Sequence, residues 1–389
     1  MFIVILGAVL ALMHVYLWKR LVKDTTRPGR TRWMLTTALL GLAGLLVAAL
    51  FLPRAFGPAD AGWYAWPGYV WFGVAAYLLL TLLALEPVRL VLRRWARRAP
   101  QPWQPDESTE LSRRLFLARA SAAAAGAASV GLVGFGTATA LGPPDVLRVP
   151  VRLRNLDPAF RGFRIAVVSD IHLGPLLGRT HTERIVGLIN EASPDMVAIV
   201  GDVIDGTVAE LGSAAAPLRD LAAREGAFFV TGNHEYFVGD TDEWLREMER
   251  WGIQPLRNEN TLIRRGAAVF NLAGVNDLAG KRDSDGPDFD RALSGISADG
   301  PTVLLAHQPV QVEEAAARGV DLQLSGHTHG GQMWPFHYLV RTAQPSLAGL
   351  SRVDDTQLYV TRGAGFWGPP VRVGAPPDIT VLSLEGVKS

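Results

Sequence analysis

The pattern of apolar positions divides the chain into two parts. Long apolar runs fill the first 141 residues, whereas short apolar runs alternate with polar segments in the remainder. The long runs cover residues 2–18, 33–52, 69–85 and 120–141. An apolar helix needs about 20 residues to cross a bilayer, and each run is close to that length. The fourth run is rich in Ala and Gly rather than Leu. We therefore predict a transmembrane region over residues 1–141, with one helix in each run.

The residues after 141 alternate as in an α/β domain. A Gly-Pro-Pro sequence marks a linker, which we place at 142–150, before a domain over residues 151–389. Buried or alternating apolar runs predict strands, and amphipathic runs predict helices between them. Strands are expected at 146–153, 163–168, 358–361 and 379–384, and helices at 179–191, 208–224, 241–251 and 310–318. This order indicates α/β layers with a mixed sheet.

Five short polar motifs in this domain follow directly on apolar, β-rich runs. They are Asp170-Ile171-His172, Gly201-Asp202, Gly232-Asn233-His234-Glu235, Ala306-His307 and Gly326-His327-Thr328-His329. Ligands of α/β proteins bind at the carboxyl edge of the sheet, so we expect these side chains to meet there. Oxygen donors mixed with imidazoles suit divalent Mn, Fe or Zn. The pattern therefore predicts a centre for two metal ions.

The spacing within the motifs is consistent with a shared centre. Extended backbone points positions i and i+2 the same way, so Asp170 and His172 can reach one ion. The same spacing lets His327 and His329 reach neighbouring ions. Asp202 follows a glycine that permits close approach, and its two oxygens can bridge two cations. Two ions roughly 3.5–4 Å apart polarise a phosphoryl group and hold a metal-bound hydroxide for in-line attack. We expect phosphoester hydrolysis without a covalent intermediate on the protein.

The motifs, in this order, resemble those of the calcineurin-like metallophosphoesterase superfamily from about Leu153 onward. The stretches 325–332 and 365–370 resemble its membrane-anchored, twin-arginine-type branch. The resemblance implies a four-layer α/β/β/α sandwich. It also implies seven ligands, with Asp202 bridging two ions: Asp170, His172 and His329 at one, and Asn233, His307 and His327 at the other. His234 corresponds to a non-ligand that contacts the phosphate or protonates the leaving group, and Glu235 to the residue that orients it.

Several other residues invite a functional or a structural interpretation. Asp205, which ends Gly-Asp-x-x-Asp, is expected to fix its loop or cap a helix rather than bind metal. His181 matches no motif and is expected at the surface or in packing. Phe366 and Trp367 either wall a substrate pocket or belong to the core. His14, in the first apolar run, is expected to reach the membrane interface without a partner.

The net charge of +1 conceals an uneven distribution. Basic residues cluster at 19–32 and 89–114, and basic loops stay in the cytoplasm, which places the amino terminus outside. If the fourth run spans, the domain is extracytoplasmic. Arg113 and Arg114 resemble a twin-arginine export signal, or are ordinary positive flanks, and we expect an uncleaved anchor. The absence of Cys excludes disulfides and thiolate metal sites, and no basic stripe indicates a nucleic acid.

The sequence therefore favours a membrane-anchored phosphohydrolase, a phosphodiesterase or phosphomonoesterase that uses two divalent metal ions. A narrower interpretation is a pyrophosphatase or phosphodiesterase for lipid-linked envelope substrates. A third is a non-catalytic membrane scaffold, which the complete ligand set and the near absence of ionisable residues in the apolar runs disfavour. The expected partners are the phosphoester, the membrane and the twin-arginine export machinery. No motif determines the loops that would line the pocket, such as 339–355, so the sequence does not identify the substrate or the metal.

Overall fold

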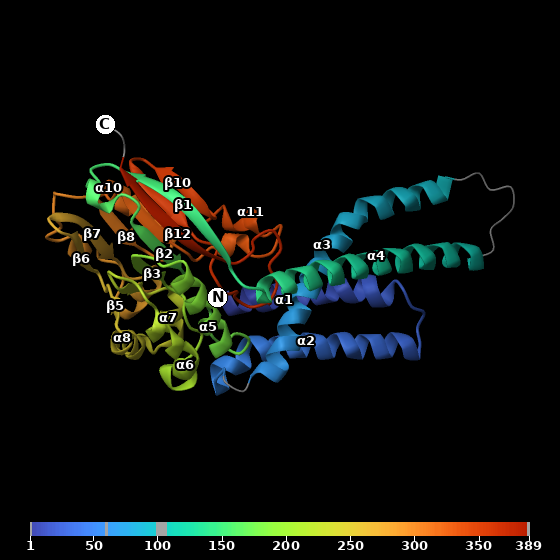
Figure 1. The fold of residues 1–389 in the computed structure, drawn as a ribbon. Coiled ribbons are helices and arrows are strands. Elements are labelled where there is room, and N and C mark those ends of the chain that lie inside the picture. Colours follow the sequence, from blue (N-terminus) through green and yellow to red (C-terminus); the bar gives the residue numbers. More distant parts are fainter. Residues whose placement is uncertain (1, 59–60, 99–106, 387–389) are drawn as a thin grey trace. The chain divides into compact units, whose positions relative to one another are not determined.

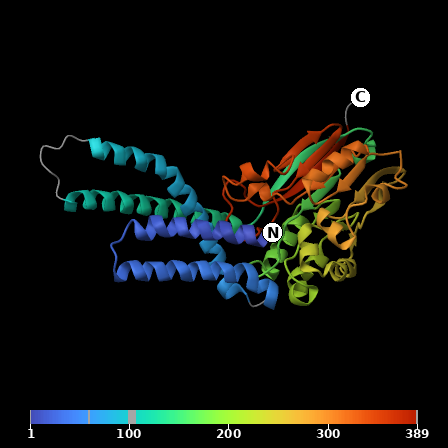
Figure 2. The same ribbon diagram turned by 180° about the vertical axis from the view of Figure 1, so that it is seen from behind.

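The computed structural model describes residues 2–58, 61–98 and 107–386. These residues form two compact units, each of which is treated by itself. Unit 1 contains most of the amino-terminal helical region, and unit 2 contains the α/β domain. Figure 1 and Figure 2 show the long helices and the packed sheets from opposite sides.

Unit 1 is built from four long helices, one for each apolar run. They are α1 (Phe2–Leu17, continued by the π-helical η1, Trp18–Lys23), α2 (Arg30–Phe56), α3 (Gly62–Arg98) and α4 (Glu107–Leu141). Several extend well past the predicted runs, because polar residues that flank an apolar run can continue the same helix. Among the described residues, four helices are long and apolar enough to cross a membrane: Val4–Lys23, Arg30–Pro53, Gly62–Leu92 and Arg113–Leu141.

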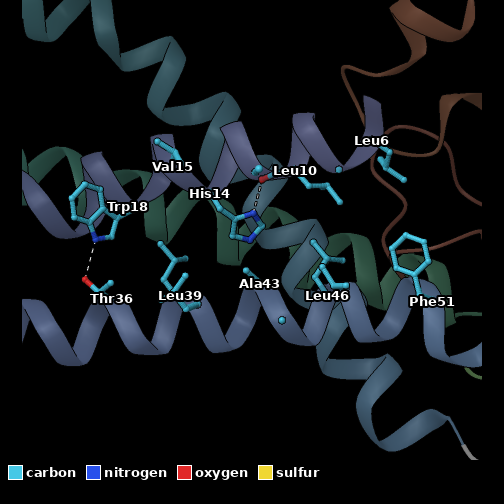
Figure 3. A pocket seen from close by; sticks show the side chains of 15 residues that line it. Leu6, Leu10, His14, Val15, Trp18, Thr36, Leu39, Ala43, Leu46 and Phe51 are labelled. Carbon is cyan, nitrogen blue, oxygen red and sulfur yellow. Dashed lines mark hydrogen bonds between the residues drawn. The ribbon is translucent and has the colours of Figure 1, made fainter. Parts of the chain in front are cut away.

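Apolar side chains from all four helices form the core of unit 1. The expectation for His14 was wrong, because this histidine has partners inside the bundle. Trp71 of α3 donates from Nε1 to His14 Nε2 over 3.1 Å, and His14 Nδ1 lies 2.8 Å from the carbonyl oxygen of Leu10. Because Nε2 accepts, Nδ1 carries the proton and donates to that carbonyl. Figure 3 shows His14 beside an apolar groove lined by α1 and α2.

A cluster of ion pairs joins α1 and α3 at one end of unit 1. Arg20 lies 3.0 Å from Asp24 and 2.8 Å from Glu86, and Arg89 lies 3.5 Å from each of these acids. The side chains of Arg20, Asp24 and Arg89 are at most 14% exposed, so the charges are largely shielded from solvent. Paired charges of this kind are far less costly than isolated ones. The cluster ties η1 and the residue that follows it, Asp24, to the interior of α3.

Unit 2 contains two six-stranded mixed sheets. The first has the order β1-β12-β2-β3-β4-β5, and the second β10-β11-β9-β8-β7-β6. The first sheet comprises β1 (Asp145–Leu153), β12 (Asp378–Gly386), β2 (Arg164–Val168), β3 (Met196–Val200), β4 (Ala227–Val230) and β5 (Ile253–Pro255). The second comprises β10 (Gly349–Val353), β11 (Thr356–Val360), β9 (Leu322–Ser325), β8 (Thr302–Leu305), β7 (Ala268–Gly274) and β6 (Glu259–Arg265).

Alternating side chains on these strands build the layers of the domain. In β2, Ile165 and Val167 enter the core between the two sheets, while Ala166 and Val168 face the helices outside the first sheet. Those helices are α5 (Arg179–Glu191), α6 (Val208–Ala215) and α8 (Thr241–Arg250). The second sheet is covered by α9 (Phe289–Ala292) and α10 (Val312–Ala317). The predicted α/β/β/α sandwich is confirmed (Figure 1).

Some predicted boundaries were wrong for local reasons. The strand predicted at 146–153 is present as β1 and begins one residue earlier, at Asp145, so most of the predicted linker 142–150 belongs to a strand that pairs in parallel with β12. The helix predicted at 208–224 ends at Ala215 and continues as the short 3-10 helix η3 (Ala216–Asp220), where Pro217 lacks the N–H that an α-helix requires. The helix predicted at 310–318 likewise begins as a 3-10 turn, η5 (Pro309–Gln311), before α10.

Candidate metal centre

The motif loops leave their strands in an unusual backbone conformation. Five of the seven predicted ligands have left-handed φ angles of 50–69°, which non-glycine residues seldom adopt and which cluster at functional sites: Asp170, His172, Asp202, His327 and His329. The extended geometry predicted for the i and i+2 pairs was therefore wrong. The side chains converge because the backbone turns at each ligand, directly after β2, β3 and β9.

Glycine makes this turn possible at position 201, where φ is +83°. A Cβ there would lie 2.6 Å from the backbone nitrogen of Gly232 and 2.7 Å from Nδ1 of His307. Both distances are shorter than van der Waals contact, so a side chain would push two motif loops apart. Gly201 thus allows the loops after β3, β4 and β8 to pack together. The sequence predicted that backbone and metal approach closely at this glycine. In the structure, the groups that approach it are Gly232 and His307, from two other motifs.

The first ligand group contains Asp170, His172 and His329. His172 Nε2 lies 3.1 Å from His329 Nε2, and Asp170 Oδ1 lies 3.3 Å from the same His329 atom. All three side chains offer one donor atom within 4.8 Å of the others. His172 Nδ1 faces Asp205 Oδ1 at 3.1 Å, and because a carboxylate accepts, this nitrogen carries the proton. The Nε2 lone pair of His172 therefore points into the group.

The second group contains Asp202, His307 and His327, with Asn233 beside them. His307 Nδ1 donates to the carbonyl oxygen of Val200 over 2.7 Å, which leaves a lone pair on Nε2. That Nε2 lies 3.2 Å from Asp202 Oδ2 and 3.2 Å from His327 Nδ1, while Asn233 Oδ1 lies 2.9 Å from His327 Nδ1. Two oxygens and two ring nitrogens thus lie close together, and a divalent cation among them would offset the repulsion between their lone pairs. The donor set therefore fits a divalent metal.

Asp202 lies between the two groups. Its Oδ2 is 3.2 Å from His307 Nε2 and 3.8 Å from His172 Nε2, so one carboxylate reaches both clusters. Burial would raise the pKa of Asp202, but the surrounding imidazoles, His307 first, hold it well below its usual value. Burial lowers the pKa of His327 to about 3, so this ring is neutral and can donate a lone pair. These groupings coincide with those that the family resemblance implies, while the bound ions stay a prediction.

His234 belongs to neither of these two groups; it forms a third cluster with His172 and Asp205, whose ligand atoms also lie within 4.8 Å of one another. Its Nδ1 lies 2.5 Å from Asp205 Oδ1, and its backbone N–H donates to Asp202 Oδ1 over 2.9 Å. Burial would lower the pKa of His234, but the carboxylates of Asp205 and Asp202 raise it to about 9. These two carboxylates therefore favour the protonated imidazole. A positively charged ring at the edge of the ligand groups suits contact with phosphate or donation of a proton.

Glu235, which was predicted to orient His234, makes its hydrogen bonds to backbone groups. Its carboxylate accepts hydrogen bonds from the backbone N–H groups of Asp202, Val203 and Gly232, at 2.6–3.0 Å, and so ties two motif loops together. The residue that orients His234 is Asp205, which also holds His172. Asp205 was expected to fix its loop or cap a helix, and the structure instead pairs it with two rings. In the sequence, the second aspartate of the Gly-Asp-x-x-Asp motif was the feature that could have indicated this role for Asp205.

Arg372 is a site residue that the sequence did not indicate. Its side chain is fully buried and lies 3.2 Å, through Nη2, from Nδ1 of His329. It also donates to backbone carbonyls, among them Gly365 at 2.8 Å and Ala375 at 3.0 Å. Burial lowers the pKa of Arg372 to about 10, which still leaves it charged. The guanidinium thus fastens the loop after β11 to a predicted metal ligand.

The two aromatic residues left open by the sequence have different environments. Phe366 is buried and packs with Ala140 and Leu177. Trp367 is partly exposed, and its ring centroid lies 5.9 Å from that of His234 in an edge-on arrangement. Phe366 therefore belongs to the core, and Trp367 forms a wall beside the site.

His181 is a packing residue on α5, and it makes a pH-dependent contribution to stability. Burial lowers its pKa to about 4, from an ordinary value of 6.5. The unfolded chain therefore binds more protons between these values, and stability falls as the pH decreases from 6.5 to 4, by ~3 kcal/mol. We expect the thermal midpoint of the wild-type protein to fall more steeply over this window than that of His181→Leu. Parallel curves for the two proteins would contradict this assignment.

Comparison with known proteins agrees with the geometry. Residues 163–331 match the calcineurin-like phosphoesterase family. A transmembrane protein with metallophosphoesterase domain from Danio rerio is 32% identical over 99% of this chain and 89% of its own length. An uncharacterized metallophosphoesterase from Campylobacter jejuni is 32% identical over the whole chain and 98% of its own length. A Bos taurus transmembrane protein with metallophosphoesterase domain is 40% identical over 64% of this chain and 59% of its own length. The chain belongs to the calcineurin-like metallophosphoesterase family.

Proposed function

We propose that this protein is a metal-dependent phosphoester hydrolase that holds two divalent cations. The observation that carries the proposal is the pair of ligand groups that share Asp202, with the charged His234 beside them. A non-catalytic scaffold would have no need to retain both groups together with a paired, protonated histidine. The metals expected from the donor types are Mn, Fe or Zn.

Different residues of the chain would have different roles in hydrolysis. Bound divalent cations would supply Lewis-acid polarisation of the phosphoryl group and activation of a water. His234 carries a proton at neutral pH, and because Nδ1 is held by Asp205, its Nε2 is the atom that can donate to the departing oxygen. Asp205 keeps the ring oriented throughout and favours its protonated form before the proton is transferred, after which the ring is neutral and must take up a proton from water. Glu235 holds the loops of Asp202 and His234 at a fixed separation.

The test uses the full chain, purified in detergent, with metal content and activity measured on the same sample. We expect close to two divalent ions per chain and hydrolysis of a generic aryl phosphodiester or phosphomonoester. Removal of metal by a chelator is expected to abolish turnover, and separate addition of Mn²⁺, Zn²⁺ or Fe²⁺ identifies the metal that restores it. Metal-replete protein without activity on any ester would favour the scaffold.

We also propose that the domain faces the cell exterior. The basic loops around residues 19–32 and 89–114 support this orientation, as does the length of α4, which suffices to cross a bilayer. A reporter that is active only outside the cytoplasm, fused after Leu141, is expected to be active. Replacement of Arg113 and Arg114 by Lys tests the twin-arginine route, with Arg94→Lys, within the same basic segment 89–114, as control. Export that survives the double replacement would contradict that route and leave the orientation standing.

A further inference from the structure

Exposed apolar side chains are concentrated in one part of the α/β domain. Among the described residues from 145 onward, seven large apolar side chains are exposed, and four of them fall within six consecutive positions, 334–339. This segment includes α11 (His337–Val340). Two of the other three flank the metal centre. We call these six side chains the apolar rim: Phe237, Trp334, Phe336, Tyr338, Leu339 and Trp367.

Two rim residues contact the proposed proton donor. The ring centroid of Phe237 lies 5.5 Å from that of His234, and the centroid of Trp367 lies 5.9 Å from it. The two rings remain 57% and 46% exposed, respectively, so their outer faces are open to solvent. A substrate whose leaving group reaches His234 must therefore pass along exposed aromatic surface.

The rest of the rim is fastened to the same loops. The side chain of Gln332 makes two hydrogen bonds to the backbone of Trp367. Its Nε2 donates to the Trp367 carbonyl over 3.0 Å, and its Oε1 accepts from the Trp367 N–H over 3.1 Å. The backbone N–H of Trp334 donates to the Val373 carbonyl over 2.9 Å. Segment 334–339 follows His329 closely in the chain, and α11 packs against the 3-10 turn η6 (His329–Gly331). The apolar residues are thus held at defined positions beside a metal ligand.

The nature of these side chains indicates the ligand. An exposed apolar cluster lowers solubility and marks a surface that something apolar covers. Trp and Tyr combine an apolar ring with a polar edge and are favoured where lipid meets water. The chain also carries four helices long and apolar enough to cross a membrane, which would hold the domain at a lipid surface. A water-soluble phosphoester makes no use of such a rim, whereas an amphiphilic one does.

We propose that the apolar rim binds the hydrocarbon tail of a lipid phosphoester while its phosphate occupies the metal centre. This inference rests on the proposed hydrolase function and names its substrate class. The tail lies against Trp367 and Phe237 next to His234 and continues over segment 334–339. The rim then selects substrates by tail length, because each methylene it covers adds binding free energy.

The test compares two methyl alkyl phosphodiesters, one with a butyl and one with a dodecyl chain, in the same detergent micelles, with release of the alkyl alcohol measured. For the full-length, metal-replete wild-type protein we expect kcat/KM for the dodecyl ester to exceed that for the butyl ester by about tenfold or more. The double variant Trp334→Ser, Leu339→Ser is expected to bring this ratio close to one. Leu350→Ser, which removes an exposed apolar side chain outside the rim, is the matched control and is expected to keep the wild-type ratio.

The possible results separate the two proposals. Hydrolysis of both esters by the wild type with a ratio near one, or an unchanged ratio in the double variant, would overturn tail binding and leave the hydrolase function intact. Loss of both activities to the same degree would also overturn it, since the rim would then only anchor the domain to the micelle. A wild-type protein that holds metal and hydrolyses neither ester would refute the hydrolase function itself. Metal content measured for each variant shows that the centre has folded.

Discussion

Replacement of Asp202 by Ala is expected to remove bound metal and to abolish hydrolysis. Asp202 is the residue whose Oδ2 lies near both ligand groups, 3.2 Å from His307 Nε2 and 3.8 Å from His172 Nε2. Its loss leaves both groups without their shared anion, while its other oxygen no longer holds the backbone of His234. Charge stabilisation by metal is worth several kcal/mol, so the activity should fall on the order of 10³-fold or more.

The measurement is metal content and kcat for the wild type, Asp202→Ala and Asp202→Asn. The Asn variant keeps the size of the side chain and removes its charge, so it separates the contribution of the anion from that of packing. Asp220→Ala is the control, because Asp220 is an exposed carboxylate on η3 that is 65% accessible. A fully active, metal-replete Asp202→Ala protein would exclude a shared role for this residue.

His234→Ala is expected to produce the opposite combination, a sharp loss of turnover with metal content unchanged. The ring lies outside the groups that contain Asp170 and Asp202. It clusters instead with His172 and Asp205, and we expect Nδ1 to stay paired with Asp205 rather than bind a metal. Removal of a general acid typically lowers kcat by about 10²–10⁴-fold. The matched comparison is His307→Ala, which removes an imidazole from the second ligand group and should release metal as well as activity.

Asp205→Asn provides an internal check on this interpretation. It keeps the imidazole but removes the carboxylate that pairs with Nδ1 of His234, and it should lower turnover less than His234→Ala does. Loss of metal in His234→Ala would identify His234 as a ligand and refute its assignment as proton donor. Equal turnover in His234→Ala and the wild type would also refute it.

The identity of the motif residues could be predicted because polar side chains directly after buried strands have few structural explanations. The strands β2, β3, β4, β8 and β9 lie close to where the apolar runs placed them, and their ends bring Asp170, Asp202 and His307 into one centre. The four-layer sandwich followed from the family resemblance of these motifs. The long apolar runs were equally informative, since few soluble folds contain four of them in succession.

The pairing of side chains around the ligands could not be predicted in the same way. Whether Asp205 or Glu235 faces His234 depends on side-chain directions within two tight loops, and left-handed residues at Asp170 and Asp202 reverse the directions that an extended chain would give. Arg372 and His329 are 43 residues apart, so their contact depends on the tertiary structure and leaves no local pattern. The predicted linker 142–150 overlaps β1 for a similar reason, because β12, the strand that pairs with these residues, is far away in the sequence.

The position of β12 has a consequence for how the domain is made. In the first sheet β12 separates β1 from β2, and Arg152 of β1 pairs with Glu385 of β12 across 233 residues of sequence. During synthesis β1 emerges directly after the last apolar helix and has no partner strand until residues 378–386 have been made. Contacts so distant in sequence close slowly, because the intervening loop must first be ordered. Any machinery that moved this domain across a membrane, as the proposed orientation requires, would therefore encounter either an incomplete sheet with a free edge or the whole finished domain.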